Sequence, residues 1–103
     1  MNVERTDFVS VLTQDIKRAK QFYTETLGLE IESEGESDME FRCGQVTLDV
    51  FEPSSIGQEF APSPAGIALR VDDVDETRVC HMATFFDPDG NRLVLHKRFA
   101  PYA

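Results

Sequence analysis

The stretch FVSVLTQDIKRAKQFYTETLG, residues 8–28, carries the pattern that decides the fold. Its opening residues alternate between two faces, and the β-branched side chains among them favour a β-strand. Asp15 then stands where a helix N-cap belongs, and apolar residues recur at helical spacing as far as Gly28, which suits the left-handed end of a helix. The stretch therefore predicts a strand followed by an amphipathic helix.

Residues 29–52 change to a period of two, which is typical of strands. The acidic residues at every second position are expected to share one face, broken by a turn near Gly35: Glu30, Glu32, Glu34, Glu36, Asp38 and Glu40. Apolar residues are expected on the inner face of two further strands: Met39, Phe41, Cys43, Val46, Leu48 and Val50. A solvated acidic face that keeps an edge strand from aggregating is more common than a cation-binding strip, so we favour the former. The first half therefore reads β-α-β-β-β.

The second half of the chain repeats the order of the first. A shift of 58 residues places Val9 on Ile67, so GIALRVDDVDETR (66–78) again reads as a strand leading to a helix start. Between the halves, PSSIGQEFAPSPA holds three of the five prolines and is expected to be a loop. We therefore predict one domain in three segments: a first module (1–52), a linker (53–65) and a second module (66–103).

The sequence FFDPDGNRLVLH, residues 85–96, contains the strongest turn signal of the chain. Asp-Pro-Asp-Gly combines a proline, whose φ is fixed, with a glycine that readily adopts positive φ, and it lies between two strand-like runs. Asp87 and Asp89 could act as paired carboxylates for a cation. As turn-forming residues they need no ligand, and we favour that role within a hairpin.

The composition and charge of the chain limit the classes of molecule that it could bind. The chain has 103 residues with 41% hydrophobic residues, and its ten Lys and Arg against nineteen Asp and Glu give a net charge of −9. Because nucleic-acid binders gain affinity by neutralising phosphates, this charge argues against DNA, RNA and anionic membranes as partners. Cys43 and Cys80 have neither the number nor the spacing of a disulfide framework or zinc knuckle, so two reduced thiols in a cytoplasmic protein are expected.

Three stretches together resemble a known family: DIKRAKQFYTETLGL, the strand with VDDVDE in the second half, and FFDPDGNRLVLH. They are similar to the vicinal oxygen chelate superfamily, which includes glyoxalases, bleomycin-resistance proteins, extradiol dioxygenases and fosfomycin-modifying enzymes. The resemblance implies an α+β fold of paired βαβββ modules whose curved mixed sheets form a cleft. Enzymes of the family hold a divalent metal there with residues on the first and fourth strands of each module.

Carried over to this chain, those metal-ligand positions fall on Phe8, Asp49, Gly66 and Val94. Three of them offer no side-chain donor, whereas a catalytic metal wants His, Glu or Asp at three or four places. We therefore expect no metal and no other cofactor, and a binding protein is favoured over an enzyme. A displaced metal site of His81, His96 and Asp49 is a less favoured alternative.

Strand parity indicates what lines the cleft in place of a metal. If the four family positions face the cleft, residues of the same strand parity face it too. We expect the binding residues among these aromatic and polar side chains: Phe8, Asp49, Phe51, Arg70, Arg92 and His96. Phe walls with a few polar groups suit a small organic ligand. The alternative is that the polar groups pair with one another on a wet sheet surface.

Three functions remain open. The favoured one is a metal-free protein that sequesters a small aromatic or cationic ligand, since an acidic surface attracts cations. Bleomycin-resistance proteins act by such sequestration of a ligand, in clefts at a dimer interface. The alternative is a metal-dependent lyase, isomerase or dioxygenase. A further alternative is a non-catalytic module that serves assembly only.

The second module appears short of most of its helix and one strand, because few residues separate Asp73 from the strand expected to begin near Val79. An aliphatic face would then lose its helical cover: Ile67, Leu69, Val71, Leu93 and Leu95. Since burying each such side chain contributes roughly 1.5–3 kcal/mol, we expect a homodimer, with exchanged elements as one form, that covers this face. An internal deletion from a longer natural protein is the other explanation.

Overall fold

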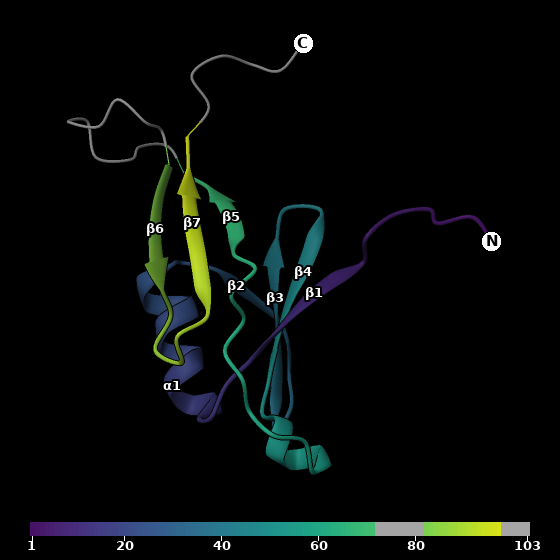
Figure 1. The fold of residues 1–103 in the computed structure, drawn as a ribbon, viewed down its shortest axis with the longest axis vertical. Helices are drawn as coiled ribbons and strands as arrows, with labels where there is room; N and C mark the ends of the chain where they lie inside the picture. The colour runs from purple at the N-terminus through teal and green to yellow at the C-terminus, as the bar shows by residue number, and fades with distance from the viewer. Residues whose placement is uncertain (72–81, 98–103) are drawn as a thin grey trace.

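The computed structural model describes residues 1–71 and 82–97. It contains two β-sheets with a short helix beside both (Figure 1). Sheet A has four strands in the order β1-β4-β3-β2, and sheet B has three in the order β5-β7-β6. Each sheet combines one parallel pair with antiparallel pairing, so the predicted α+β fold with mixed sheets is confirmed.

The elements follow the predicted order along the chain. Those of the first half are β1 (Phe8–Leu12), α1 (Ile16–Gln21), the π-helical turn η1 (Phe22–Thr26), β2 (Glu30–Glu34), β3 (Asp38–Cys43) and β4 (Val46–Phe51). Those of the second are the 3-10 turn η2 (Pro53–Ile56), β5 (Ile67–Arg70), β6 (Met82–Phe86) and β7 (Arg92–His96). No helix among the described residues is long and apolar enough to cross a membrane.

The helix begins and ends at the residues that the sequence predicts. The Asp15 carboxylate accepts hydrogen bonds from the backbone N–H groups of Lys17 and Arg18, at 3.1 and 3.2 Å. Gly28 has φ +70°, a value that a residue with a Cβ rarely adopts. The last turn differs from a regular α-helix because η1 is π-helical.

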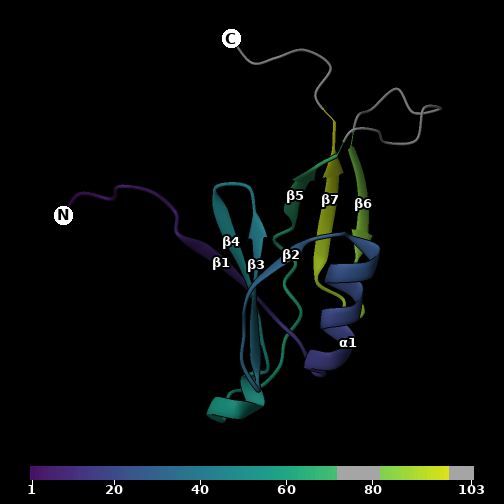
Figure 2. The ribbon, with the colours of Figure 1, turned by 180° about the vertical axis from the view of Figure 1, so that it is seen from behind.

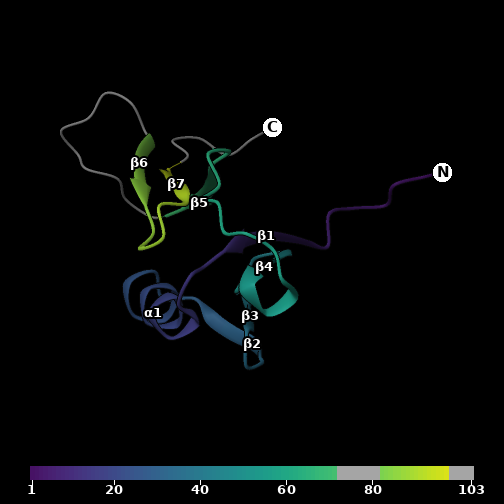
Figure 3. The same ribbon diagram turned by 60° about the horizontal axis from the view of Figure 1, so that its bottom comes forward.

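Two adjacent aromatic residues of η1 reach both sheets. The Tyr23 ring packs against Phe41 of sheet A, with ring centroids 5.5 Å apart, and the Phe22 ring lies 6.4 Å from Phe85 of sheet B. Because consecutive helical residues point about 100° apart, such a pair can contact two sheets that meet at an angle around the helix. Figure 3 shows α1 in the angle between them.

The strand pairing confirms the internal repeat. In sheet A, Val9 lies opposite Leu48 in the parallel pair of β1 and β4. In sheet B, Ile67 lies opposite Leu93 in the parallel pair of β5 and β7. The same alignment matches Asp49 with Val94. Residues 72–81, which include Asp73 and Val79, lie outside the described residues.

The predicted loss of helical cover on sheet B is wrong for Leu69 and Leu93, whereas Val71 and Leu95 are only half-buried. Leu93 is 0% exposed and belongs to the same core cluster as Ala19 and Tyr23, and Leu69 is 9% exposed. The helix of the first module lies beside both sheets, as Figure 2 shows from behind, and its Ala19 shares one core cluster with residues of both sheets. The exposed aromatic side chains lie on the opposite faces, with Phe8 57% and Phe86 60% exposed.

We call the sheet sides that point away from α1 the open faces. On β1, β3 and β4, the open face of sheet A comprises nine side chains: Phe8, Ser10, Leu12, Asp38, Glu40, Arg42, Thr47, Asp49 and Phe51. That of sheet B comprises eight: Ala68, Arg70, Met82, Thr84, Phe86, Arg92, Val94 and His96. The parity predicted for the cleft residues matches these two faces.

Candidate binding site

The open face of sheet A is arranged around one carboxylate. Asp49 lies in register between Glu40 on β3 and Ser10 on β1. The Ser10 hydroxyl donates a hydrogen bond to Asp49 Oδ2 at 3.0 Å. Partial burial raises the pKa of Asp49, the nearby Asp38 raises it further, and the Ser10 hydrogen bond opposes both.

Two aromatic side chains flank the row formed by Glu40, Asp49 and Ser10. Phe8 lies on β1 two residues before Ser10, and Phe51 lies on β4 two residues after Asp49, so both share the open face. More than half of the Phe8 side chain is in solvent, and Phe51 is half-buried. A half-buried carboxylate between two aromatic faces is a suitable arrangement for an organic cation or an aromatic ring.

The acidic residues of β2 and β3 do not all share one face, which corrects the sequence prediction. A register shift between Ile31 and Ser33 breaks the alternation of β2. Glu32 stays on the open face, where it accepts a hydrogen bond from Thr47 at 2.8 Å. Glu34 instead forms an ion pair with Lys20 of α1 at 2.9 Å.

The predicted basic residues lie on sheet B. Arg70 and His96 are opposite one another on β5 and β7, and Arg92 lies at the start of β7. Arg70 lines a cavity of about 380 Å³, whereas Arg92 lines a separate hollow of about 180 Å³ beside Phe86. Asp49 lines neither of these two hollows.

The geometry therefore brings the six predicted residues together as two groups. Phe8, Asp49 and Phe51 share the open face of sheet A, and the two arginines and His96 share that of sheet B. Because both sheets pack their other faces on the same helix, the two open faces point away from it in different directions (Figure 3). One chain alone does not close a cleft around all six.

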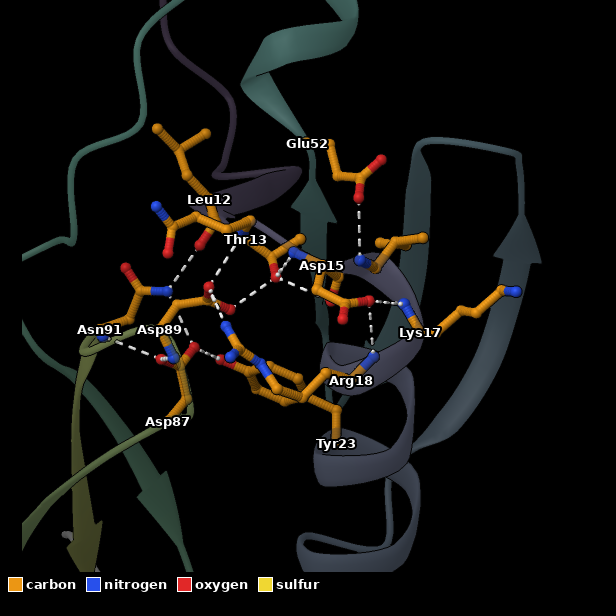
Figure 4. Close-up of polar contacts among 12 residues, drawn as sticks. Leu12, Thr13, Asp15, Lys17, Arg18, Tyr23, Glu52, Asp87, Asp89 and Asn91 are labelled. Carbon is orange, nitrogen blue, oxygen red and sulfur yellow. Dashed lines mark hydrogen bonds and ion pairs between the residues drawn. The ribbon is translucent and has the colours of Figure 1, made fainter.

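A buried polar cluster holds the hairpin between β6 and β7 against the start of α1 (Figure 4). Asp89 accepts hydrogen bonds from the Thr13 hydroxyl at 2.5 Å, from the Gln14 N–H at 2.9 Å and from the Arg18 guanidinium at 2.7 Å. Its side chain is 0% exposed. Both oxygens of this carboxylate thus accept hydrogen bonds from protein donors.

Asp87 is saturated in the same way. It accepts hydrogen bonds from the Tyr23 hydroxyl at 2.7 Å and from the Asn91 side chain at 2.8 Å, and also from two backbone N–H groups. Burial and this hydrogen bond raise the pKa of Tyr23 above its usual range. Gly90, at φ +86°, closes the turn onto the Asp87 carbonyl. The turn-forming role of the two aspartates is confirmed.

The sequence also resembles known proteins along most of its length. A model of the Glyoxalase/Bleomycin resistance protein/Dioxygenase superfamily matches residues 5–80. The chain belongs to this superfamily. A search of curated proteins gives no match.

Solved structures of the superfamily share the fold. A lactoylglutathione lyase from Agrobacterium tumefaciens is 19% identical with a TM-score of 0.72, covering 93% of this chain and 95% of that one. A putative glyoxalase family protein from Bacillus anthracis is 23% identical with a TM-score of 0.72, covering 94% and 97%. TnmS3, an antibiotic binding protein from Streptomyces sp. CB03234, is 24% identical with a TM-score of 0.71, covering 94% and 98%.

The residues at the superfamily's metal positions do not fit a metal. Gly66, at φ +78°, lies so close to the Arg92 guanidinium that a Cβ there would be 2.6 Å from Nη1. Val94 is a buried aliphatic residue, and Phe8 is an exposed aromatic one. The described residues contain no group of three or more His, Cys, Asp or Glu placed to hold an ion. His81, needed for the displaced site, lies outside the described residues.

Proposed function

We propose that this superfamily member is a metal-free binding protein that sequesters a small cationic or aromatic molecule. The observation that carries the proposal is the half-buried Asp49 carboxylate, held by Ser10 and flanked by Phe8 and Phe51. A ligand cation would pair with the carboxylate while its aromatic or apolar part packs on the Phe rings. Free, half-buried Cys43 is compatible with the reducing cytoplasm, where we place the protein.

The charge around Asp49 favours a cation over an anion. Glu40 and Asp38 lie on the adjacent strand of the same face, and Glu32 reaches that face as well. Arg42 is the one cation on the open face of sheet A, and it lies 3.6 and 3.8 Å from the carboxylates of β2. The net charge of −9 adds a long-range attraction for cationic ligands.

The first test is a calorimetric titration of the protein with bleomycin and with doxorubicin, two cationic antibiotics that differ in aromatic area. Replacing Asp49 with Asn is expected to lower the affinity for the bound compound about tenfold or more, because a charge-assisted contact is removed. The affinity of the unsubstituted protein should fall as the pH drops through the raised pKa of Asp49, since protonation removes the charge.

The matched control is Glu25→Gln, which removes one negative charge from an exposed position on η1. It is expected to leave the affinity nearly unchanged. Equal losses in both variants would mean that only net charge attracts the ligand. Equal affinity of Asp49→Asn and the unsubstituted protein would place the ligand elsewhere.

We further propose that a second copy of the chain completes the cleft. In this arrangement the open face of sheet A of one chain meets the open face of sheet B of the other, which brings Arg92 and His96 opposite Asp49. The arrangement would also cover Phe8 and Phe86, whose large exposed aromatic surfaces suit an interface. A two-fold axis would then produce two identical clefts per dimer.

Complementation tests this arrangement directly. Asp49→Asn and Arg92→Ala are each expected to lose binding, but a reassociated mixture forms heterodimers in which one cleft has both residues intact. Random mixing should restore about a quarter of the binding sites. Light scattering during size-exclusion chromatography checks the dimer itself. A stable monomer at micromolar concentration, or no recovery on mixing, would contradict the shared cleft.

A further inference from the structure

A cavity that is not lined by Asp49 has a different chemistry from the site around that carboxylate. It has a volume of about 380 Å³, within the range of roughly 300–1,000 Å³ of small-molecule sites. Its apolar lining comes from the end of η1 and the start of β2 on one side and from sheet B on the other: Leu27, Leu29, Leu69 and Leu95. The β3–β4 turn contributes the remaining wall.

Among the residues that the structure describes, two arginines are the charged ones that line this cavity. Arg42 comes from β3 and Arg70 from the end of β5. Arg42 is 62% exposed and has carboxylates at 3.6 and 3.8 Å, distances longer than direct hydrogen bonds. The Arg70 side chain makes no hydrogen bond or ion pair with any described residue, so its guanidinium is available to a ligand.

We propose that this cavity binds a small amphipathic carboxylate, with its apolar chain against the leucines and its carboxylate on Arg70. A guanidinium presents two parallel N–H donors that match the two oxygens of a carboxylate. The aliphatic lining would remove the ligand's chain from water. The site takes an organic anion, so it differs from the Asp49 face in charge preference, and Asp49 does not line it.

Decanoate is the probe, and decylamine and decanol, which carry the same chain with other head groups, are its comparators. Calorimetry is expected to give one decanoate bound per chain, with decylamine and decanol at least about tenfold weaker. Arg70→Ala should lower the affinity for decanoate by about tenfold or more. Because Arg70 is exposed and unpaired among the described residues, this variant should keep the unfolding midpoint of the unsubstituted protein.

Arg5→Ala is the matched control, since Arg5 is an exposed arginine paired with Asp7 and does not line the cavity. It should bind decanoate with unchanged affinity. A second readout uses Cys43, which lines the cavity as a half-buried thiol. In a Cys80→Ser background, saturating decanoate should slow alkylation of Cys43 several-fold.

Three results would overturn the proposal: absence of decanoate binding, equal binding of decanol, or full affinity in Arg70→Ala. Unchanged Cys43 alkylation with decanoate bound would place the anion at another site. Asp49→Asn should lose the cationic ligand but bind decanoate normally, because Asp49 does not line this cavity. Failure of one proposal is therefore distinguishable from failure of the other.

Discussion

Replacing Asp89 with Ala is expected to lower the free energy of unfolding by about 2–4 kcal/mol. The substitution removes a fully buried carboxylate and leaves the Gln14 N–H without its acceptor, and it leaves the Thr13 hydroxyl with only the Asp15 carbonyl at 3.0 Å. Each orphaned buried polar group costs about 1–3 kcal/mol. Arg18 is 45% exposed and can turn to water, so the loss stays below that of a wholly buried ion pair.

Urea denaturation at one fixed protein concentration measures this effect, because stability depends on concentration if the chain dimerises. The matched control is Asp7→Ala, in which an exposed aspartate loses an ion pair with Arg5. Its unfolding midpoint should not change, since exposed ion pairs contribute little. Equal midpoints for both variants would mean that the Asp89 cluster does not hold the hairpin to the helix.

Leu93→Ala is expected to destabilise the protein by about 2–5 kcal/mol, the range for a large buried aliphatic residue. Leu93 is on β7 of the second module, yet it is 0% exposed within the core that the helix of the first module forms. The truncation would leave a cavity between sheet B and the helix. The prediction therefore tests whether one helix serves both sheets.

Ile56→Ala is the control for Leu93→Ala, because Ile56 is an aliphatic residue of similar size that is 68% exposed. Its truncation should change the unfolding midpoint little. A small effect at Leu93 with retained secondary structure would contradict the packing of sheet B on α1. It would also restore the argument that another chain must cover that aliphatic face.

Local patterns in the sequence predicted the first half of the fold well. The alternation around Val11, the Asp15 cap and Gly28 are set by neighbouring residues, and each lies where the pattern placed it. The pairing of β1 with β4 and of β5 with β7, which was not predicted from the sequence, agrees with the repeat. These features depend on contacts within a module.

Features that depend on contacts between the two modules could not be predicted from local sequence patterns. The sequence pattern places Phe22 and Tyr23 on one apolar helix face. No neighbouring residue indicates that their rings pack against different sheets. The shift near Ile31 changes the face of Glu34 without any glycine or proline to mark it. Parity placed Arg92 on the right face, but only the structure shows that its guanidinium fills the space beside Gly66.

The buried cluster was missed for a related reason. A tyrosine at a core-facing helical position needs a partner for its hydroxyl, and this signal points to a buried acceptor. The sequence does not say which of nineteen acidic residues supplies it. The structure identifies Asp87, and it shows that the strongest turn of the chain is also the contact between the two modules.

The most direct test of the central claim is metal analysis of untagged protein after dialysis against trace Zn, Ni, Mn and Fe and then against metal-free buffer. A metal-free binding protein should retain far less than one equivalent of any of these metals, because the family positions at Phe8, Gly66 and Val94 carry no donor. Near-stoichiometric retention of one metal would contradict this account. It would favour a site built on His81, His96 and Asp49, and with it an enzymatic function.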